Sequence, residues 1–335
     1  MYFPGLVHRS SWRRLQEESC ALRERGLASG TWANKISHLR SYIVFTEYYR
    51  VPDFPVFLGV LLRFIALLAR GPYAYSSASN LISSLRWFAN LLDPPSVKVF
   101  DSVLVSSTFK GLRAQLSRPV RQKLPFSVDH LLLFYNILDL SVPKQLACWC
   151  AMLLAFFGCF RISNLVPPSK GKFDPSKHLK RDDIRFEKNF VLIYYKWSKT
   201  NQNSDKVSWI PIHPVSDYRF NVRKYLKYLF KIVKAPSDAP LFSFDKDCHS
   251  KFSLIRLLDK CIYEAGLPLG DYSWHSFRRG AAVFAFELGL TDSAVQLLGD
   301  WSSPAFKQYL EFAFIRKADV AKKISSNFDL IVNNL

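Results

Sequence analysis

The chain has 335 residues, of which 49% are hydrophobic and 22% are charged, and this balance excludes a disordered protein and allows two domains of ordinary size. It carries 46 lysines and arginines against 27 aspartates and glutamates, a net charge of +19. Because such an excess destabilises a compact fold by self-repulsion, it indicates an anionic partner, first nucleic acid and second an anionic membrane surface.

Helical periodicity runs through the first part of the chain, from Ser10 to about Phe109. Serine or threonine precedes several of the apolar patterns and glycine ends two of them, as is typical of helix caps. We predict a helical N-terminal domain over residues 1–116, built as a small bundle. Its expected helices cover residues 11–26, 31–50, 54–71, 76–92 and 96–116.

A basic segment, residues 117–125, separates the two parts of the chain. It carries Arg118, Arg121 and Lys123 around two prolines. Proline lacks a backbone donor and biases its predecessor toward extended structure, so the segment is predicted to be a linker. It is either a solvated tether or the part of a clamp that passes over a DNA duplex.

The second part, residues 126–335, mixes helices with a β-hairpin. An apolar run at 145–160 holds fewer residues than the roughly 20 that a membrane-crossing helix needs, so we interpret it as a core helix. Residues 188–214 alternate β-rich runs around a polar turn, which predicts a hairpin. Further helices are expected at 127–140, 216–233, 251–266, 276–289, 291–300 and 304–323.

The six cysteines lie in or near apolar segments and form no C-x-x-C pair. Cys248, His249 and Cys261 together lack a fourth metal ligand. We therefore expect free structural thiols, no metal site and no cofactor. The N-terminal segment lacks the long apolar region of a secretory signal, so we expect an intracellular protein that does not insert into a membrane.

Among the candidate site residues, Arg161 comes first in the chain and directly adjoins an apolar run. It follows AFFGCF directly, so its guanidinium is expected to leave the end of a buried helix. Arginine is rarely buried without a partner, which indicates either a bound anion or an ion pair with Glu187 or another carboxylate.

Lys199 lies in WSKTNQ, near the tip of the predicted hairpin. A flexible ammonium at this point either reaches into a groove or is simply solvated. Lys196 and Lys206 are close enough in the chain to take the same role. Alternation of side chains along the strand does not choose among the three lysines.

The stretch WHSFRRGAA opens a predicted helix with His275 and Arg278 three positions apart, on one face. Free backbone N–H groups at a helix start also favour a phosphate. Arg279, one position further, faces elsewhere and is expected to serve the DNA backbone or the structure. Trp301 and Tyr309 follow, and each by itself is most simply a core residue.

Together, the order of FGCFRISNL, KWSKTNQ, HSFRR and LGDWSS, with a tyrosine beyond them, resembles the tyrosine recombinase (phage integrase) family over most of the chain. The residues of these motifs are most similar to those in recombinases of eukaryotic mobile elements, the DIRS-like and Ngaro-like retroelements or Cryptons. The first half is similar to the SAM-like core-binding domain of that family.

The resemblance implies a mainly α fold with a small β-sheet or hairpin in the C-terminal domain. A helical core-binding domain and a mixed α+β catalytic domain, residues 126–335, would form a clamp around DNA. The implied catalytic residues are Arg161, Lys199, His275, Arg278, Trp301 and Tyr309. Asp300 competes with Trp301 by spacing, and Asn164 stands where many relatives carry an acidic residue.

The function implied by the resemblance is site-specific DNA recombination or integration through a 3′-phosphotyrosyl intermediate, without metal or ATP. The expected partners are double-stranded DNA and further copies of the chain, in a dimeric or tetrameric synapse, and the expected location is the nucleus. Three alternatives remain: a domesticated DNA-binding protein without cleavage activity, a type IB topoisomerase-like enzyme, and a helical protein of membrane surfaces. The expected DNA-binding residues are Lys35, Arg40, Arg86, Arg118, Arg121, Lys123 and Arg279.

Overall fold

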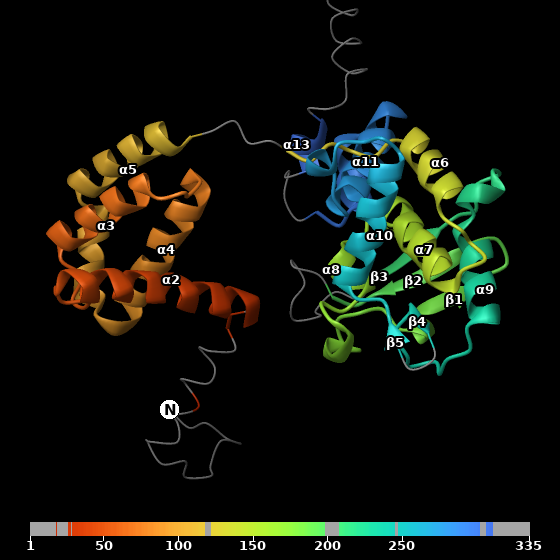
Figure 1. The fold of residues 1–335 in the computed structure, drawn as a ribbon, viewed down its shortest axis with the longest axis horizontal. Coiled ribbons are helices and arrows are strands. Elements are labelled where there is room, and N and C mark those ends of the chain that lie inside the picture. Colours follow the sequence, from red (N-terminus) through yellow and green to blue (C-terminus); the bar gives the residue numbers. More distant parts are fainter. Residues whose placement is uncertain are drawn as a thin grey trace, which may run out of the picture. The chain divides into compact units, whose positions relative to one another are not determined.

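In the computed structural model the chain divides into two compact units, residues 1–120 and 121–335 (Figure 1). The structure describes residue 18 and residues 26–27, 29–117, 122–197, 208–244, 247–301 and 306–310. Each unit has a hydrophobic core of its own.

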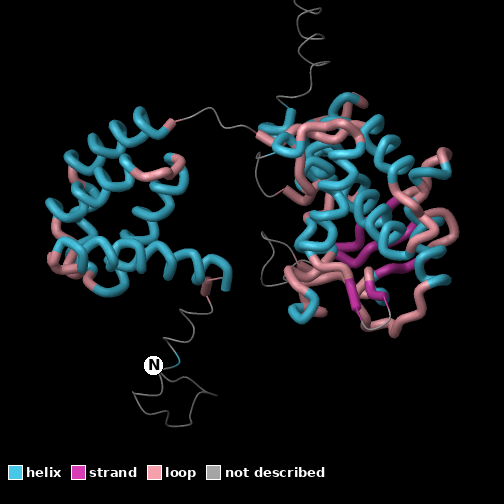
Figure 2. The backbone as a smooth tube through the Cα atoms, in the orientation of Figure 1, coloured by secondary structure: helices cyan, strands magenta, loops and turns pink. Residues whose placement is uncertain are grey.

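The described part of the first unit is helical, as Figure 2 shows. Its α-helices are α2 (Ser29–Tyr49), α3 (Leu58–Arg70), α4 (Tyr75–Leu92) and α5 (Val103–Leu116). On α3 the buried side chains are Leu61, Phe64, Ile65 and Leu68, the spacing of an amphipathic helix facing a core. The helix expected at 11–26 lies almost wholly outside the described residues.

The continuous helix expected at 96–116 is wrong, because the chain breaks at Ser102. A 3-10 helix, Pro94–Asp101, comes first and opens with two prolines. Ser102 then takes the N-cap position of α5 and its side chain accepts a hydrogen bond from the Leu104 N–H. A serine oxygen satisfies a free N–H at a helix start, which favours a new helix over a continued one.

The second unit surrounds α7 (Pro143–Phe157), which is buried at every position from Leu146 to Phe156. A helix that is apolar on all sides forms the centre of a core. The other described α-helices of this unit are α6 (Val128–Ile137), α8 (Ile162–Leu165), α9 (Val222–Ile232), α10 (Lys251–Glu264), α11 (His275–Glu287), α12 (Asp292–Leu298) and α13 (Lys307–Leu310). Short 3-10 turns lie at Lys170–Lys172, Arg181–Asp183, Tyr218–Phe220 and Leu269–Asp271.

A three-stranded antiparallel sheet has the order β1 (Ile184–Phe186), β2 (Val191–Tyr195), β3 (Ser208–Ile212). The pairing of β2 with β3 confirms the predicted hairpin, and Ile193 lies opposite Ile210. The sequence pattern does not predict β1, which is too short to show alternation. It also does not predict a second pair of short strands, β4 (Ser243–Phe244) and β5 (Asp247–Cys248).

The predicted fold class, mainly helical with a small sheet in the second unit, is therefore confirmed (Figure 2). Along the described segments, no helix combines the length and apolar character required to cross a membrane.

Candidate active site

Arg161 opens a short helix instead of ending a long one, which corrects the expectation from the sequence. The helix α7 ends at Phe157 and Gly158 caps it. Cys159 then adopts a left-handed conformation, with φ of 51°, which turns the chain sharply. Arg161 follows as the N-cap residue of α8 and is half-buried.

Arg278 lies in the first turn of α11, which begins at His275, and is only 2% exposed. Its two terminal nitrogens donate to the backbone carbonyls of Cys159 and Gly299. Its Nε is buried without a partner among the described residues. Loss of solvation, followed by the positive charge of Arg161, lowers the pKa of Arg278. The two predicted arginines therefore lie close enough to repel each other.

His275 and Tyr309 are in direct contact across α11 and α13. The distance from His275 Nε2 to Tyr309 Oη is 2.8 Å. Loss of solvation and the positive charges of Arg279, Arg278 and Arg161 lower the pKa of His275 to about 4. At neutral pH the imidazole is uncharged and can accept the tyrosine proton.

Trp301 faces the same group of residues, whereas Asp300 faces solvent. The Arg278 guanidinium carbon lies 4.3 Å from the centre of the Trp301 ring, and the Tyr309 ring centre lies 5.9 Å from it. The ring packs on Gly299, where an added Cβ would lie 2.0 Å from it. Asp300 is exposed in a left-handed turn, with φ of 48°. Of the two competing residues, this geometry favours Trp301 over Asp300 as a member of the candidate site.

In the described part of the chain, the assembled site carries positive charge that no acidic side chain neutralises. Among the described residues, neither Arg161 nor Arg278 forms an ion pair with a carboxylate, and the alternative pairing with Glu187 is not seen. The Glu187 carbonyl instead accepts from Arg223. Two guanidinium groups beside a neutral imidazole and a tyrosine hydroxyl suit an anion such as a phosphate.

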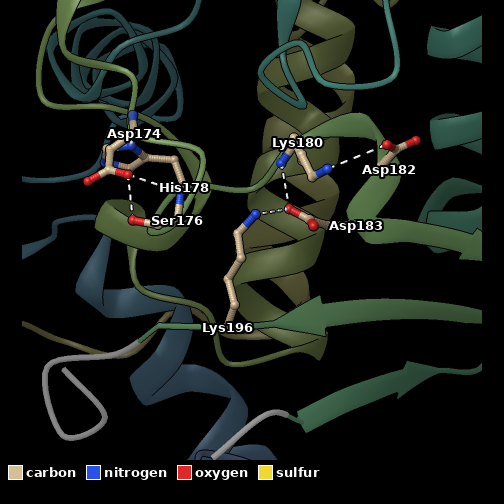
Figure 3. A network of polar contacts seen from close by, with 7 residues as sticks. All are labelled: Asp174, Ser176, His178, Lys180, Asp182, Asp183 and Lys196. Atoms are coloured by element: carbon tan, nitrogen blue, oxygen red, sulfur yellow. Dashed lines mark hydrogen bonds and ion pairs between the residues drawn. The ribbon is translucent and has the colours of Figure 1, made fainter. Parts of the chain in front are cut away.

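Lys196, one of the three competing lysines, follows the last residue of β2 at the end of the strand that leads to the hairpin tip. Lys196 Nζ lies 2.6 Å from a carboxylate oxygen of Asp183, with side-chain exposures of 11% and 4% (Figure 3). The same oxygen accepts from the Lys180 N–H at 2.8 Å. Lys196 is thus held in a buried ion pair. Lys199 and Lys206 lie outside the described residues.

Asn164 connects α8 to the same hairpin. The residue is 2% exposed, and its side-chain N–H donates to the Trp197 carbonyl at 2.7 Å. Its backbone N–H donates to the Arg161 carbonyl at 2.8 Å. The ring centres of Phe160 and Tyr195 lie 5.5 Å apart, so a second contact joins the two segments. A carboxylate at position 164 could not donate to a carbonyl.

A second polar cluster in Figure 3 closes the loop before β1. The His178 ring nitrogen accepts from the Asp174 N–H at 2.9 Å, and the Asp174 carboxylate accepts from Ser176 at 2.5 Å. Loss of solvation lowers the pKa of His178. These bonds are local to the loop and have the character of structural support.

The residues expected to bind DNA have varied surroundings. Lys123 Nζ donates to the Gly270 carbonyl at 2.6 Å, and Arg86 pairs with Asp101 at 2.9 Å. The ammonium of Lys35 lies 4.8 Å from the centre of the Trp87 ring. Arg40 is exposed, Arg279 lies over the Tyr309 ring, and Arg118 and Arg121 lie outside the described residues.

Within the described segments, no group of three or more histidine, cysteine or acidic side chains is arranged to hold a metal ion. His249, considered above with two cysteines, uses both ring nitrogens in contacts with the Lys144 carbonyl and the Ser253 hydroxyl. Burial raises the pKa of the Cys261 thiol to about 12.

Comparison with solved structures identifies the architecture. A lambda integrase fragment, residues 75–356 of that protein, solved as a dimer on a COC′ core site, is similar over 88% of this chain and 93% of its own, with a TM-score of 0.56 and 17% identity. XerH site-specific recombinase, solved on palindromic difH as a post-cleavage complex, is similar over 83% and 76%, with a TM-score of 0.58 and 16% identity. The Tn1549 transposon integrase, solved with circular intermediate DNA, is similar over 88% and 94%, with a TM-score of 0.57 and 15% identity.

This chain has the tyrosine recombinase fold. The sequence by itself produced no match to models of protein families or to curated proteins. The likeness therefore lies in the three-dimensional arrangement of the helices and the sheet, at identities too low to carry residue roles. The roles must be argued from the site.

Proposed function

We propose that this protein is a site-specific DNA recombinase or integrase that acts through a covalent bond between Tyr309 and a DNA 3′-phosphate. The observation that carries the proposal is the 2.8 Å contact of Tyr309 Oη with His275 Nε2, beside the buried guanidinium of Arg278. A hydroxyl nucleophile against a neutral base, next to cations without carboxylate partners among the described residues, suits attack on a phosphodiester.

In the proposed cleavage step, Tyr309 Oη attacks the phosphorus in line while its proton moves to His275 Nε2. A bond forms between the tyrosine oxygen and phosphorus, and the bond from phosphorus to the 5′-oxygen breaks. The phosphotyrosyl bond conserves the energy of the phosphodiester. A 5′-hydroxyl from the partner strand can then reverse the reaction and release Tyr309, without an external energy source.

The two arginines stabilise the negative charge that develops on the non-bridging oxygens. Each guanidinium presents a planar fork of donors that matches a phosphate. Arg278 uses two donors on backbone carbonyls, which orient the group, while Nε remains without a partner among the described residues. Trp301, stacked on Arg278, excludes water from one side of the charge and can add an indole donor.

Lys199 is proposed to protonate the departing 5′-oxygen. The buried pairing of Lys196 with Asp183 supports this choice over Lys196, because the Lys196 ammonium is already bound to a carboxylate and is not free to reach a departing oxygen. Lys199→Ala should cleave slowly, yet recover on DNA whose bridging 5′-oxygen is replaced by sulfur, since a thiolate leaves without a proton. Arg161→Ala should not recover. Rescue of Lys206→Ala instead of Lys199→Ala would transfer the role to Lys206.

The proposed partners are double-stranded DNA and further copies of the chain in a dimeric or tetrameric synapse. The net charge of +19 and the fold shared with a lambda integrase dimer on a core site support both. Each neutralised phosphate should contribute about −0.9 to the slope of log affinity against log salt. A slope near zero would contradict a DNA clamp formed by residues 1–116, the linker and residues 126–335.

A mobile-element origin and a nuclear location form the finer part of the proposal. They rest on the similarity of RISNLVP, HSFRRGAA and LGDWSS to the motifs of DIRS-like, Ngaro-like and Crypton recombinases. Covalent capture of DNA from the flanks of the gene, rather than of unrelated DNA, would support this origin.

Tyr309→Phe tests the proposed function most directly. The full-length chain is incubated with nicked duplexes from the DNA flanking the gene and scored for a denaturation-resistant protein–DNA adduct. The wild type should form the adduct, and the variant should bind DNA without forming it. Tyr272→Phe is the matched control, because that ring stacks on Phe126 and should leave adduct formation intact.

The same experiment separates the alternatives. A domesticated DNA-binding protein would bind without any adduct in the wild type. A type IB topoisomerase-like enzyme would form the adduct and relax supercoiled DNA as a monomer, without joining two duplexes. A protein of membrane surfaces would bind anionic liposomes in preference to DNA.

A further inference from the structure

Arg279 contacts two segments that lie far apart in the sequence. Its Nη1 donates to the backbone carbonyl of Lys123, which precedes α6. Its guanidinium carbon also lies 5.0 Å from the centre of the Tyr309 ring, on α13. One half-buried side chain therefore joins the start of the second unit to the proposed nucleophile.

Residues 122–126, called the strap below, are attached along their length to the second unit. The Lys123 ammonium donates to the Gly270 carbonyl at 2.6 Å. The Leu124 N–H donates to the Asp271 carbonyl at 2.8 Å. The strap follows directly from the residues that connect the two units, so it is the point at which that connection is anchored.

The strap also lies against the first turns of α11. The Phe126 N–H donates to the Ser276 carbonyl at 3.0 Å, and its ring stacks on Tyr272 at 4.8 Å with a 4° angle between planes. At Gly280 an added Cβ would lie 1.9 Å from the Phe126 carbonyl oxygen. Only glycine leaves room for this approach, so the strap and α11 occupy a common, tightly defined position.

We propose that Arg279 is a positioning residue that links the strap to Tyr309 and thereby holds the nucleophile beside His275. This inference rests on the proposed function, because it assigns a role within that reaction. A planar guanidinium can donate in one direction while its face lies on an aromatic ring, whereas an ammonium lacks that plane and fork. An arginine is therefore suited to hold both partners, and a lysine is not.

The electrostatic surroundings agree with this role. The charge of Arg279 is among the causes that lower the pKa of His275, so it helps to keep the base neutral. Its Nε is buried without a partner among the described residues. The side chain thus acts on both members of the nucleophile–base pair, although the sequence pattern assigned it to the DNA backbone.

The test compares Arg279→Lys and Lys123→Ala with the control Arg223→Ala. Arg223 is half-buried and also donates to a backbone carbonyl, that of Glu187, but it has no role assigned in the site. Two quantities are measured on the full-length chain: the single-turnover rate of adduct formation at saturating nicked DNA, and backbone hydrogen exchange of a peptide containing residues 306–310.

For Arg279→Lys we expect a rate lower by about 10- to 100-fold, because small displacements of a reacting group have effects of that size. Lys123→Ala should produce a smaller loss, since it loosens the strap while Arg279 remains. Both variants should raise hydrogen exchange at residues 306–310. Arg279→Lys keeps the positive charge, so it should leave DNA affinity and its salt dependence unchanged. Arg223→Ala should alter neither the rate nor the exchange of that peptide.

The opposite outcome would identify a DNA contact. If Arg279→Lys cleaves and exchanges like the wild type while Arg279→Ala reduces the salt slope by about 0.9, the arginine binds a phosphate and the inference is wrong. If the wild type forms no adduct, the proposed function fails, and the exchange measurement alone decides the positioning role: protection lost in both Arg279→Lys and Lys123→Ala supports it, and unchanged protection overturns it.

Discussion

Two buried cations in the second unit, Lys196 and Arg278, have opposite surroundings. Lys196 lies at the end of β2 and is paired with the buried carboxylate of Asp183. Arg278 lies on α11 and has only the carbonyls of Cys159 and Gly299 as hydrogen-bond partners among the described residues. The first charge is neutralised within the protein, whereas the second is oriented but left without an opposite charge.

This difference indicates that Lys196 stabilises the fold and that Arg278 is available to bind an anion. Removing a charge from water costs several kcal/mol, and a carboxylate placed against it returns much of that cost. At Lys196 the carboxylate of Asp183 compensates for the lost hydration, so the ion pair stabilises the end of β2. At Arg278 the compensating negative charge must come from a ligand, and a phosphate would supply it. Mutations at the two positions should therefore affect different measurements.

The largest expected effect is on stability, from Lys196→Met. It leaves the Asp183 carboxylate buried without its cation, which should lower the free energy of unfolding by about 3–5 kcal/mol in a urea titration. The double variant Lys196→Met with Asp183→Asn should recover part of the loss, because no buried charge remains. A loss below about 1 kcal/mol would mean that the pair behaves like an exposed one.

Arg278→Met should show the reverse pattern. Adduct formation should slow by about 100- to 1,000-fold, as when one donor to a developing negative charge is removed. The free energy of unfolding should fall less than in Lys196→Met, since no carboxylate loses a partner. Equal losses of stability in the two variants, with an unchanged cleavage rate, would remove the distinction between the two cations.

Asn164→Asp should have an intermediate effect. The variant keeps the shape of the side chain but loses the donor to the Trp197 carbonyl, and a buried group left unsatisfied costs about 1–3 kcal/mol. Thermal or urea unfolding should detect this loss, and adduct formation should slow because the hairpin is less firmly held. Ser163→Ala, at the exposed neighbouring position, is the control and should be neutral.

The smallest expected effect concerns pH. The pKa of His275 is lowered to about 4, so its ring is neutral at pH 7 and gains a proton only as the pH falls through about 4. Adduct formation should therefore be constant from pH 7 to pH 5 and decline below that. Arg161→Gln removes one of the charges responsible and should move the decline to higher pH. A wild-type decline centred near 6.5 would show that neither burial nor the arginine charges lower the pKa of this histidine.

Much of the fold followed from local pattern. Apolar spacing predicted α3, α4, α7 and α10 near their observed positions, and alternation predicted the pairing of β2 with β3. The failures were also local in origin. The break at Ser102 depends on a single cap, and β1 is three residues long, so neither leaves a periodic signal.

The candidate site was predicted residue by residue but not contact by contact. Order and spacing selected His275, Arg278 and Tyr309. For the remaining position spacing favoured Asp300, and Trp301 was preferred because a carboxylate would repel a phosphate whereas an indole N–H can donate to it. The two side chains differ in surroundings because the left-handed turn at Asp300 directs one residue to solvent and the next onto Arg278. In this turn the Trp301 ring packs on Gly299, where an added Cβ would lie 2.0 Å from it, so the orientation depends on a contact between residues on the two sides of Asp300.

By itself, then, the sequence determined the chemical groups, the helical and strand segments and the excess of positive charge, because these depend on residue type and on neighbours in the chain. Only the tertiary structure decided which cations are neutralised. Lys196 meets Asp183 thirteen residues away, and Arg279 meets both Lys123 and Tyr309 from opposite ends of the second unit. Coulomb attraction and hydrogen bonding act over a few ångströms of space, so contacts between distant segments exist only after the helices and the sheet have packed.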